Sequence, residues 1–98
     1  MTTPLRVEPS AIRTPAPVPE AYLAAIRADL EQRGVPVADL AVASSEAVTW
    51  RDSSLGCPRE GMAYTQALVP GMRVVVSADG RQFDYRFGSD AAPRLCEG

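Results

Sequence analysis

The strongest constraint on the fold is the Asp79-Gly80 pair, which lies between two runs of alternating apolar and polar residues. An Asp-Gly pair in this setting is a strong short-range signal for a two-residue β-hairpin turn. With these residues in the turn, six large apolar residues face one another on one side: Met72 and Phe87, Val74 and Tyr85, Val76 and Phe83. A shift by one residue would scatter them over both sides, so the pattern fixes the register.

The other face of this hairpin is mostly polar. The same register makes Arg73 and Asp84 diagonal neighbours and puts Gln82 and Arg86 on their side. We therefore expect this face to contact solvent.

Two further runs upstream also have the composition of strands. In residues 39–50, Leu40, Val42, Val48 and Trp50 share one parity, and an interruption at 44–46 indicates a bulge or bend. Residues 63–69 form the second run, and Pro70-Gly71 predicts a turn after it. Four antiparallel strands are thus expected, at 39–50, 63–69, 72–77 and 81–87.

Residues 19–33 have the period of an amphipathic helix. Leu23, Ile26 and Leu30 recur at i, i+3 and i+7, and Gly34 ends the pattern. The predicted fold class is therefore α+β, with one N-terminal helix packed on a four-stranded antiparallel sheet as a two-layer roll.

The first residues differ in composition from the rest. Residues 1–19 hold five of the nine prolines and show neither a helical nor a strand period. Such segments are typically extended linkers. We predict a Pro-rich flexible leader at 1–18, or an arm that docks on another chain, followed by a single α+β domain at 19–98.

The residue types that are absent exclude most familiar enzyme chemistry. All ten basic residues are Arg, and the chain has no His and no Lys. It therefore lacks a Ser-His or Cys-His nucleophile pair, a lysine Schiff base, a P-loop lysine and an imidazole metal ligand. We expect no enzyme activity, no cofactor and no metal site.

Charge and hydropathy limit the classes of partner that we expect. The formal net charge is -2, and the arginines are scattered from Arg6 to Arg94 without a basic stripe, so we expect no nucleic acid. The sequence contains no run of about 18 apolar residues, so we expect no membrane insertion. No signal peptide is visible in this chain. The expected partner is an unknown protein or small ligand, and a monomer and a weak dimer are both open.

The two cysteines, Cys57 and Cys96, offer a covalent clamp. The predicted core is thin, because fifteen of the apolar residues are Ala, and small domains with thin cores are often stabilised by a disulfide. A disulfide between these cysteines, which are 39 positions apart in the sequence, would stabilise the folded chain by roughly 3 to 4 kcal/mol. We favour the disulfide over two buried or idle thiols. The expected localisation depends on the redox state of the two cysteines. We expect a cytoplasmic protein by default and an extracytoplasmic one if the cysteines are bonded.

The segment 51–62 is longer than an ordinary hairpin connection, and long ordered loops often carry function. The candidate binding residues lie in this loop and at the flanking strand ends: Trp50, Asp52, Arg59, Glu60, Tyr64 and Gln66. A core position for Trp50 and a turn-capping role for Asp52 are the structural alternatives.

The loop also carries a motif of defined spacing. It reads Trp50-x-Asp-Ser-Ser-Leu-Gly-Cys-Pro58, then Gly61-x-x-Tyr-x-Gln66, then Pro70-Gly71 and a cysteine near the end. This motif resembles a family of small bacterial proteins usually left as uncharacterised. Its members often look secreted or lipid-anchored, which implies bonded cysteines. The helix-then-sheet order resembles cystatin-like and PepSY-like modules, a likeness that does not fix function.

These observations support three functional hypotheses. The first is a non-catalytic binding module that presents loop 51–62. The second is a serine protease inhibitor that uses Cys57-Pro58-Arg59-Glu60 as a substrate-like loop, with Arg59 entering an acidic specificity pocket; this resembles the Cys-Pro-x loops of subtilisin-inhibitor and Kazal-type inhibitors. The third and weakest is a thiol-based enzyme, in which Arg51 or Arg59 lowers the pKa of Cys57 without any general base.

Overall fold

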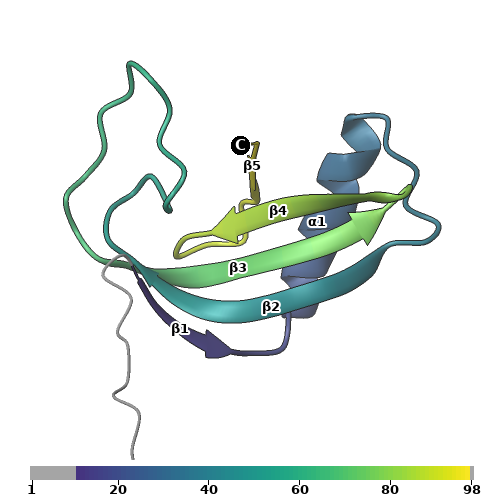
Figure 1. Ribbon diagram of the computed structural model, residues 1–98, viewed down its shortest axis with the longest axis horizontal. Helices are drawn as coiled ribbons and strands as arrows, with labels where there is room; N and C mark the ends of the chain where they lie inside the picture. Colours follow the sequence, from purple (N-terminus) through teal and green to yellow (C-terminus); the bar gives the residue numbers. More distant parts are fainter. Residues whose placement is uncertain (1–10, 98) are drawn as a thin grey trace, which may run out of the picture.

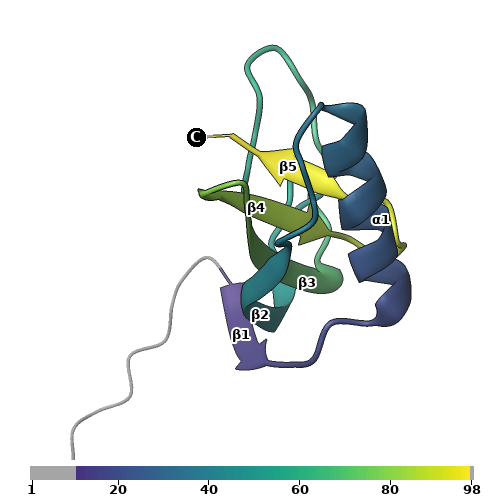
Figure 2. The same ribbon diagram turned by 90° about the vertical axis from the view of Figure 1, so that its right-hand side faces the viewer.

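The computed structural model describes residues 11–97, which form one helix and a five-stranded antiparallel sheet (Figure 1). Each strand pairs with the next one along the chain, and the helix lies across one face of the sheet (Figure 2). The elements are β1 (Ala11–Pro15), α1 (Glu20–Gln32), β2 (Ala41–Trp50), β3 (Val69–Ala78), β4 (Arg81–Phe87) and β5 (Arg94–Cys96). The α+β class with one helix is confirmed.

The β3–β4 hairpin has the predicted register. Met72 pairs with Phe87, Val74 with Tyr85 and Val76 with Phe83. Asp79 and Gly80 form the turn with φ values of 54° and 73°. Positive φ at both central residues is the geometry that matches the twist of the flanking strands.

Helix α1 covers the apolar face of this hairpin. Ile26 and Leu30 are fully buried against it, and the ring of Tyr22 stacks on that of Phe87 with centroids 4.1 Å apart. After the helix, Gly34 takes a φ of 78°, which favours glycine. The predicted helix is thus confirmed, and Ile26 and Leu30 of its apolar stripe are buried, whereas Leu23 is half-buried.

The strand assignments need three corrections. Residues 63–69 do not form a separate strand: only Val69 is in a strand, as the first residue of β3, and Pro70-Gly71 lies within β3 instead of forming the expected turn. Strand β1 lies within the segment 1–18 that was expected to be a flexible leader, and residues 11–15 instead pair with β2 at the sheet edge, where proline is tolerated. Strand β5 has three residues, too few to give a periodic signal. The remainder of the N-terminal segment, residues 1–10, lies outside the described residues.

A bulge in β2 changes which face its side chains occupy. The pairing shifts between Val42 and Ser44, close to the expected interruption. Val42 pairs with Val76 of the helix-covered face, whereas Trp50 pairs with Val69 of the opposite face. The prediction that all the apolar residues of this strand face one side is therefore wrong: Trp50 lies in a separate cluster.

Candidate functional site

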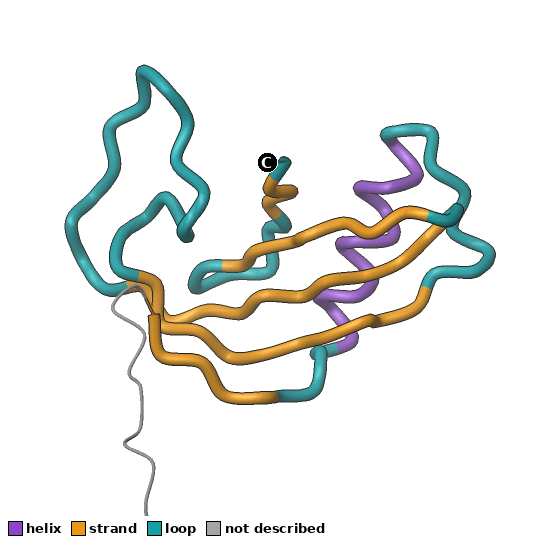
Figure 3. Tube along the Cα trace, viewed as in Figure 1, coloured by secondary structure: helices purple, strands orange, loops and turns teal. Residues whose placement is uncertain are grey.

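The connection between β2 and β3, residues 51–68, extends well beyond the end of the sheet (Figure 3). Its first part folds onto the face that α1 does not cover, where the buried side chain of Leu55 packs in a cluster with Val48, Trp50 and the half-buried Val69. This small second core positions the loop relative to the sheet.

A tight turn begins the loop. The Asp52 carboxylate accepts hydrogen bonds from the backbone N–H and the hydroxyl of Ser54, with a donor–acceptor distance of 2.9 Å for the backbone bond. These bonds favour the ionised form and hold the pKa of Asp52 below its ordinary value. Asp52 thus acts as a turn cap in the loop scaffold.

The next residues turn sharply over Trp50. Leu55 and Gly56 both have positive φ, 55° and 71°. A Cβ at Gly56 would lie 2.8 Å from Nη1 of Arg86 and 3.1 Å from the indole of Trp50. Only a residue without a side chain fits this approach without displacing its neighbours.

Trp50 itself is covered by this turn. Its side chain is 4% exposed, and its indole Nε1 donates to the Phe87 carbonyl at 3.0 Å. The guanidinium of Arg86 lies 5.3 Å from the ring centre and donates to the Leu55 carbonyl at 3.0 Å. Trp50 is therefore a support beneath the loop, and its ring is not available as a surface anchor.

The charged face beside Trp50 is less exposed than we expected. Asp84 accepts hydrogen bonds from Arg73 and Arg86, and Glu46 pairs with Arg73 at 3.7 Å. Burial alone would raise the pKa of Asp84, but the bonds from the two guanidinium groups outweigh it and hold that pKa below its ordinary value. The expected solvent-facing surface is instead a half-buried ion network under the loop.

The predicted disulfide is present. Cys57 and Cys96 are bonded, with their Cα atoms 6.0 Å apart, so the loop is fastened to β5. A second link lies nearby, because Nη1 of Arg94 donates to the Ser53 carbonyl at 3.0 Å. One covalent bond and one charged hydrogen bond thus join the loop to the last strand.

The outer part of the loop is held by bonds within it. The backbone N–H of Ser53 donates to the Thr65 carbonyl at 3.2 Å, and the Thr65 N–H donates to the Ser53 hydroxyl at 2.9 Å. The Tyr64 hydroxyl accepts from the Arg59 N–H at 2.9 Å, and the Arg59 carbonyl accepts from the Met62 N–H at 3.2 Å. These bonds close the loop at its base and near its tip.

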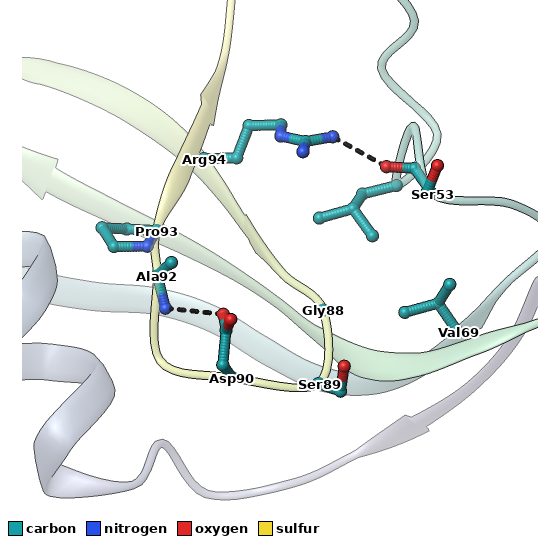
Figure 4. A pocket seen from close by; sticks show the side chains of 9 residues that line it. Ser53, Val69, Gly88, Ser89, Asp90, Ala92, Pro93 and Arg94 are labelled. Atoms are coloured by element: carbon teal, nitrogen blue, oxygen red, sulfur yellow. Dashed lines mark hydrogen bonds between the residues drawn. The ribbon is translucent and has the colours of Figure 1, made fainter. Parts of the chain in front are cut away.

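Two hollows flank the fastened loop. The larger, about 380 Å³, lies between the loop and the β4–β5 connection (Figure 4), and we call it the Arg94 cleft. The smaller measures about 260 Å³, and Arg94 lines both hollows. The Arg94 cleft is lined by Ser53, Leu55, Val69, Gly88, Ser89, Asp90, Ala92, Pro93 and Arg94, and the smaller hollow by Cys57, Arg59, Met62, Tyr64 and Arg94.

The six predicted binding residues do not form one site. Arg59 and Tyr64 meet at the smaller hollow, whereas Trp50 and Asp52 support the loop from within. Glu60 and Gln66 are exposed and line neither hollow.

Sequence reasoning missed the residues of the β4–β5 connection, above all Asp90 and Arg94. The signal that could have found them is the expected disulfide: a bond from Cys57 to Cys96 brings the residues just before Cys96 beside the loop.

Within residues 11–97, no group of three or more His, Cys, Asp or Glu side chains is arranged to hold a metal ion. In the same part of the chain, no helix has the length and apolar character needed to cross a membrane.

Comparison with known families gives a match over most of the chain. A family model described as a domain of unknown function (DUF8738) matches residues 23–96, from within α1 to the end of β5. Searches among curated proteins and among solved structures found no match, so the likeness to cystatin-like and PepSY-like modules stays a prediction. The quoted motif also stays a prediction, while the expectation of an uncharacterised family is confirmed. The chain belongs to the DUF8738 family of domains of unknown function.

Proposed function

We propose that this chain is a non-catalytic binding domain that presents loop 51–62 to a ligand. The observation that carries the proposal is the contrast between a fixed base and an exposed tip. The base is bonded to β5 through Cys57 and Cys96 and packs on the sheet through Leu55, whereas Arg59 and Glu60 are exposed.

Such a loop loses little conformational freedom when it binds. Its turn at Asp52 and its bonds between Ser53 and Thr65 are already formed in the free chain. Preorganisation of this kind improves affinity because less ordering entropy is lost on association. The exposed Met62, at 61%, adds an apolar contact beside the charged tip.

The protease-inhibitor hypothesis has weaker support. A substrate-like loop offers an extended backbone, with the N–H and C=O groups of its specificity residue free for the protease. In this chain the Arg59 N–H bonds to Tyr64 and the Arg59 carbonyl accepts from Met62. An assay against trypsin and subtilisin tests it: inhibition at micromolar concentration would favour this hypothesis over a general binding role.

A thiol-based reaction also has little support. A thiolate is the reactive form of cysteine, and the sulfur of Cys57 is bonded to Cys96.

The binding proposal can be tested by two-dimensional amide NMR with a fixed set of probes. The set holds small carboxylates, amines, neutral aromatic compounds and capped tripeptides. We expect saturable shift changes at residues 51–62 and at the facing residues 88–95, and weaker binding when the disulfide is reduced. The reduced wild-type chain is the matched control, because its sequence is unchanged. Absence of any saturable shift in these segments at millimolar probe concentration would contradict the proposal.

A further inference from the structure

We propose that the Arg94 cleft binds a carboxylate flanked by an amide N–H and an apolar side chain, the chemistry of a peptide C-terminus. This inference rests on the proposed binding function and names its ligand.

Within residues 11–97, Arg94 has no carboxylate partner of the kind that Arg73 and Arg86 have. Among the arginines from Arg27 onward, three are half-buried, and two of these, Arg73 and Arg86, share Asp84. Among residues 11–97, no ion pair joins Arg94 to a carboxylate. Its hydrogen bond goes to the Ser53 carbonyl, a neutral acceptor. A guanidinium has five N–H donors, so donors remain for an anion.

The sheet register makes this missing charge more significant. Arg94 is the direct partner of Arg86 across β4 and β5. Like charges directly opposite each other destabilise a strand pair. Asp84 compensates Arg86, and an anion bound in the cleft would compensate Arg94 in the same way. A carboxylate matches the guanidinium geometry, because it accepts two parallel N–H bonds.

The opposite end of the cleft carries the reverse charge. The exposed Asp90 lies at the end away from the Arg94 guanidinium (Figure 4), and its Oδ1 accepts from the Ala92 N–H at 3.0 Å. Its second oxygen is available to a ligand donor. A multiply charged anion such as phosphate would be repelled by Asp90, whereas a group with a carboxylate at one end and an N–H donor nearby suits both ends.

Apolar side chains line part of the cleft between these ends. Leu55 and Val69 line one side, and Ala92 and Pro93 line the other. The cleft volume, about 380 Å³, lies within the range of small-ligand sites. The last residue of a peptide supplies all three features at once: a carboxylate, an amide N–H and a side chain for the apolar walls.

The experiment titrates three probes into the oxidised full-length chain, followed by amide NMR. They are the tripeptide acetyl-Ala-Ala-Leu with a free carboxylate, the same tripeptide with a C-terminal amide, and acetyl-leucine. We expect the free acid to shift residues 53–55 and 88–95, and the amide to bind at least about tenfold more weakly, because a charge-assisted bond is lost. Similar affinity of acid and amide would overturn the inference. Acetyl-leucine separates two sources of the same chemistry: affinity equal to the tripeptide indicates a free small acid, and weaker affinity indicates a peptide end.

Two protein variants add a matched comparison. Arg94→Gln should lower the affinity for the free acid at least about tenfold, while Arg27→Gln, at an exposed arginine of α1 that lines neither hollow, should change that affinity less than about twofold. The comparison of the free acid with the amidated peptide uses only the wild-type protein, so it tests the inference even if the Arg94→Gln variant does not fold. The amines and neutral aromatic compounds used to test the binding proposal separate the two proposals. If those probes shift the amide signals of residues 51–62 and the free acid does not, this inference fails and the proposed binding function stands. If no probe binds, both fail.

Discussion

The hydroxyl of Tyr85 donates a hydrogen bond of 2.6 Å to the carboxylate of Asp29, and so joins the middle of β4 to α1. Asp29 also accepts from Arg33 at 2.7 Å. Burial alone would raise the pKa of Asp29, but the hydrogen bonds from Tyr85 and Arg33 outweigh burial and hold that pKa below its ordinary value. Burial, together with the hydrogen bond to Asp29, raises the pKa of Tyr85. The layers are thus held by a directional contact as well as by apolar packing.

Removal of this hydroxyl should weaken the fold mainly through the lost hydrogen bond. We expect Tyr85→Phe to lower the free energy of unfolding by about 1 to 2 kcal/mol in urea, because a hydrogen bond to a charged acceptor is lost. Tyr22→Phe is the control: it keeps the ring stacked on Phe87 and should change the free energy of unfolding by less than about 0.5 kcal/mol. Equal effects of the two variants would contradict the role of the Tyr85–Asp29 bond.

Acid should destabilise the protein partly through Asp84. Because the pKa of Asp84 is lower in the folded chain than its ordinary value of 3.8, the ionised carboxylate stabilises the fold above about pH 4. That contribution is lost as the pH falls through the folded pKa. We expect Asp84→Asn to be about 2 kcal/mol less stable at pH 7 and to lose less stability than the wild type between pH 4 and pH 2.

The control for this pH experiment is Glu31→Gln, which removes an exposed carboxylate of α1. Its free energy of unfolding should follow the wild-type pH dependence. A steep acid loss that persists unchanged in Asp84→Asn would mean that Asp84 contributes nothing to it.

Short-range patterns predicted the elements whose signals are local. The hairpin register follows from the Asp79-Gly80 turn and the alternation around it, and α1 follows from the spacing of Ile26 and Leu30. Strand β1 gave no such signal, because its partner β2 is distant in sequence and its own segment is rich in proline. Pairing energy from the neighbouring strand, rather than local propensity, explains why it forms.

The candidate site was harder to predict because its shape depends on hydrogen bonds between residues of the same loop. Residues 63–69 alternate like a strand, yet Tyr64 bonds to Arg59 and Thr65 to Ser53. Trp50 was expected to complete the helix-covered layer, but the bulge in β2 moved it to the other face. The importance of Arg94 depends on β5, whose three residues are too few to show a pattern.

Gly71 should tolerate no side chain. A Cβ there would lie 2.0 Å from the carbonyl oxygen of Phe87, the acceptor for the indole of Trp50. We expect Gly71→Ala to cost at least about 2 kcal/mol, since backbone must move, and to shift Trp emission to longer wavelength as the indole bond is lost. Gly88→Ala, with its nearest contact at 3.4 Å, is the control and should leave the emission of the single Trp unchanged. Indistinguishable emission and stability in the two variants would refute this account of Gly71.

Reduction of the Cys57–Cys96 bond should loosen the loop more than the sheet. The bond joins residues 39 apart in sequence, for which chain entropy predicts a loss of about 4 kcal/mol on reduction. The β3–β4 hairpin keeps its strand register and remains covered by α1. Its amides should therefore stay better protected from hydrogen exchange than those of the loop. Amide hydrogen exchange of oxidised and reduced chain measures this: residues 51–62 should exchange markedly faster after reduction, and residues 72–87 should change only by the global loss of stability. Uniform acceleration along the whole chain would mean that the disulfide holds the fold as a unit rather than fastening the loop to β5.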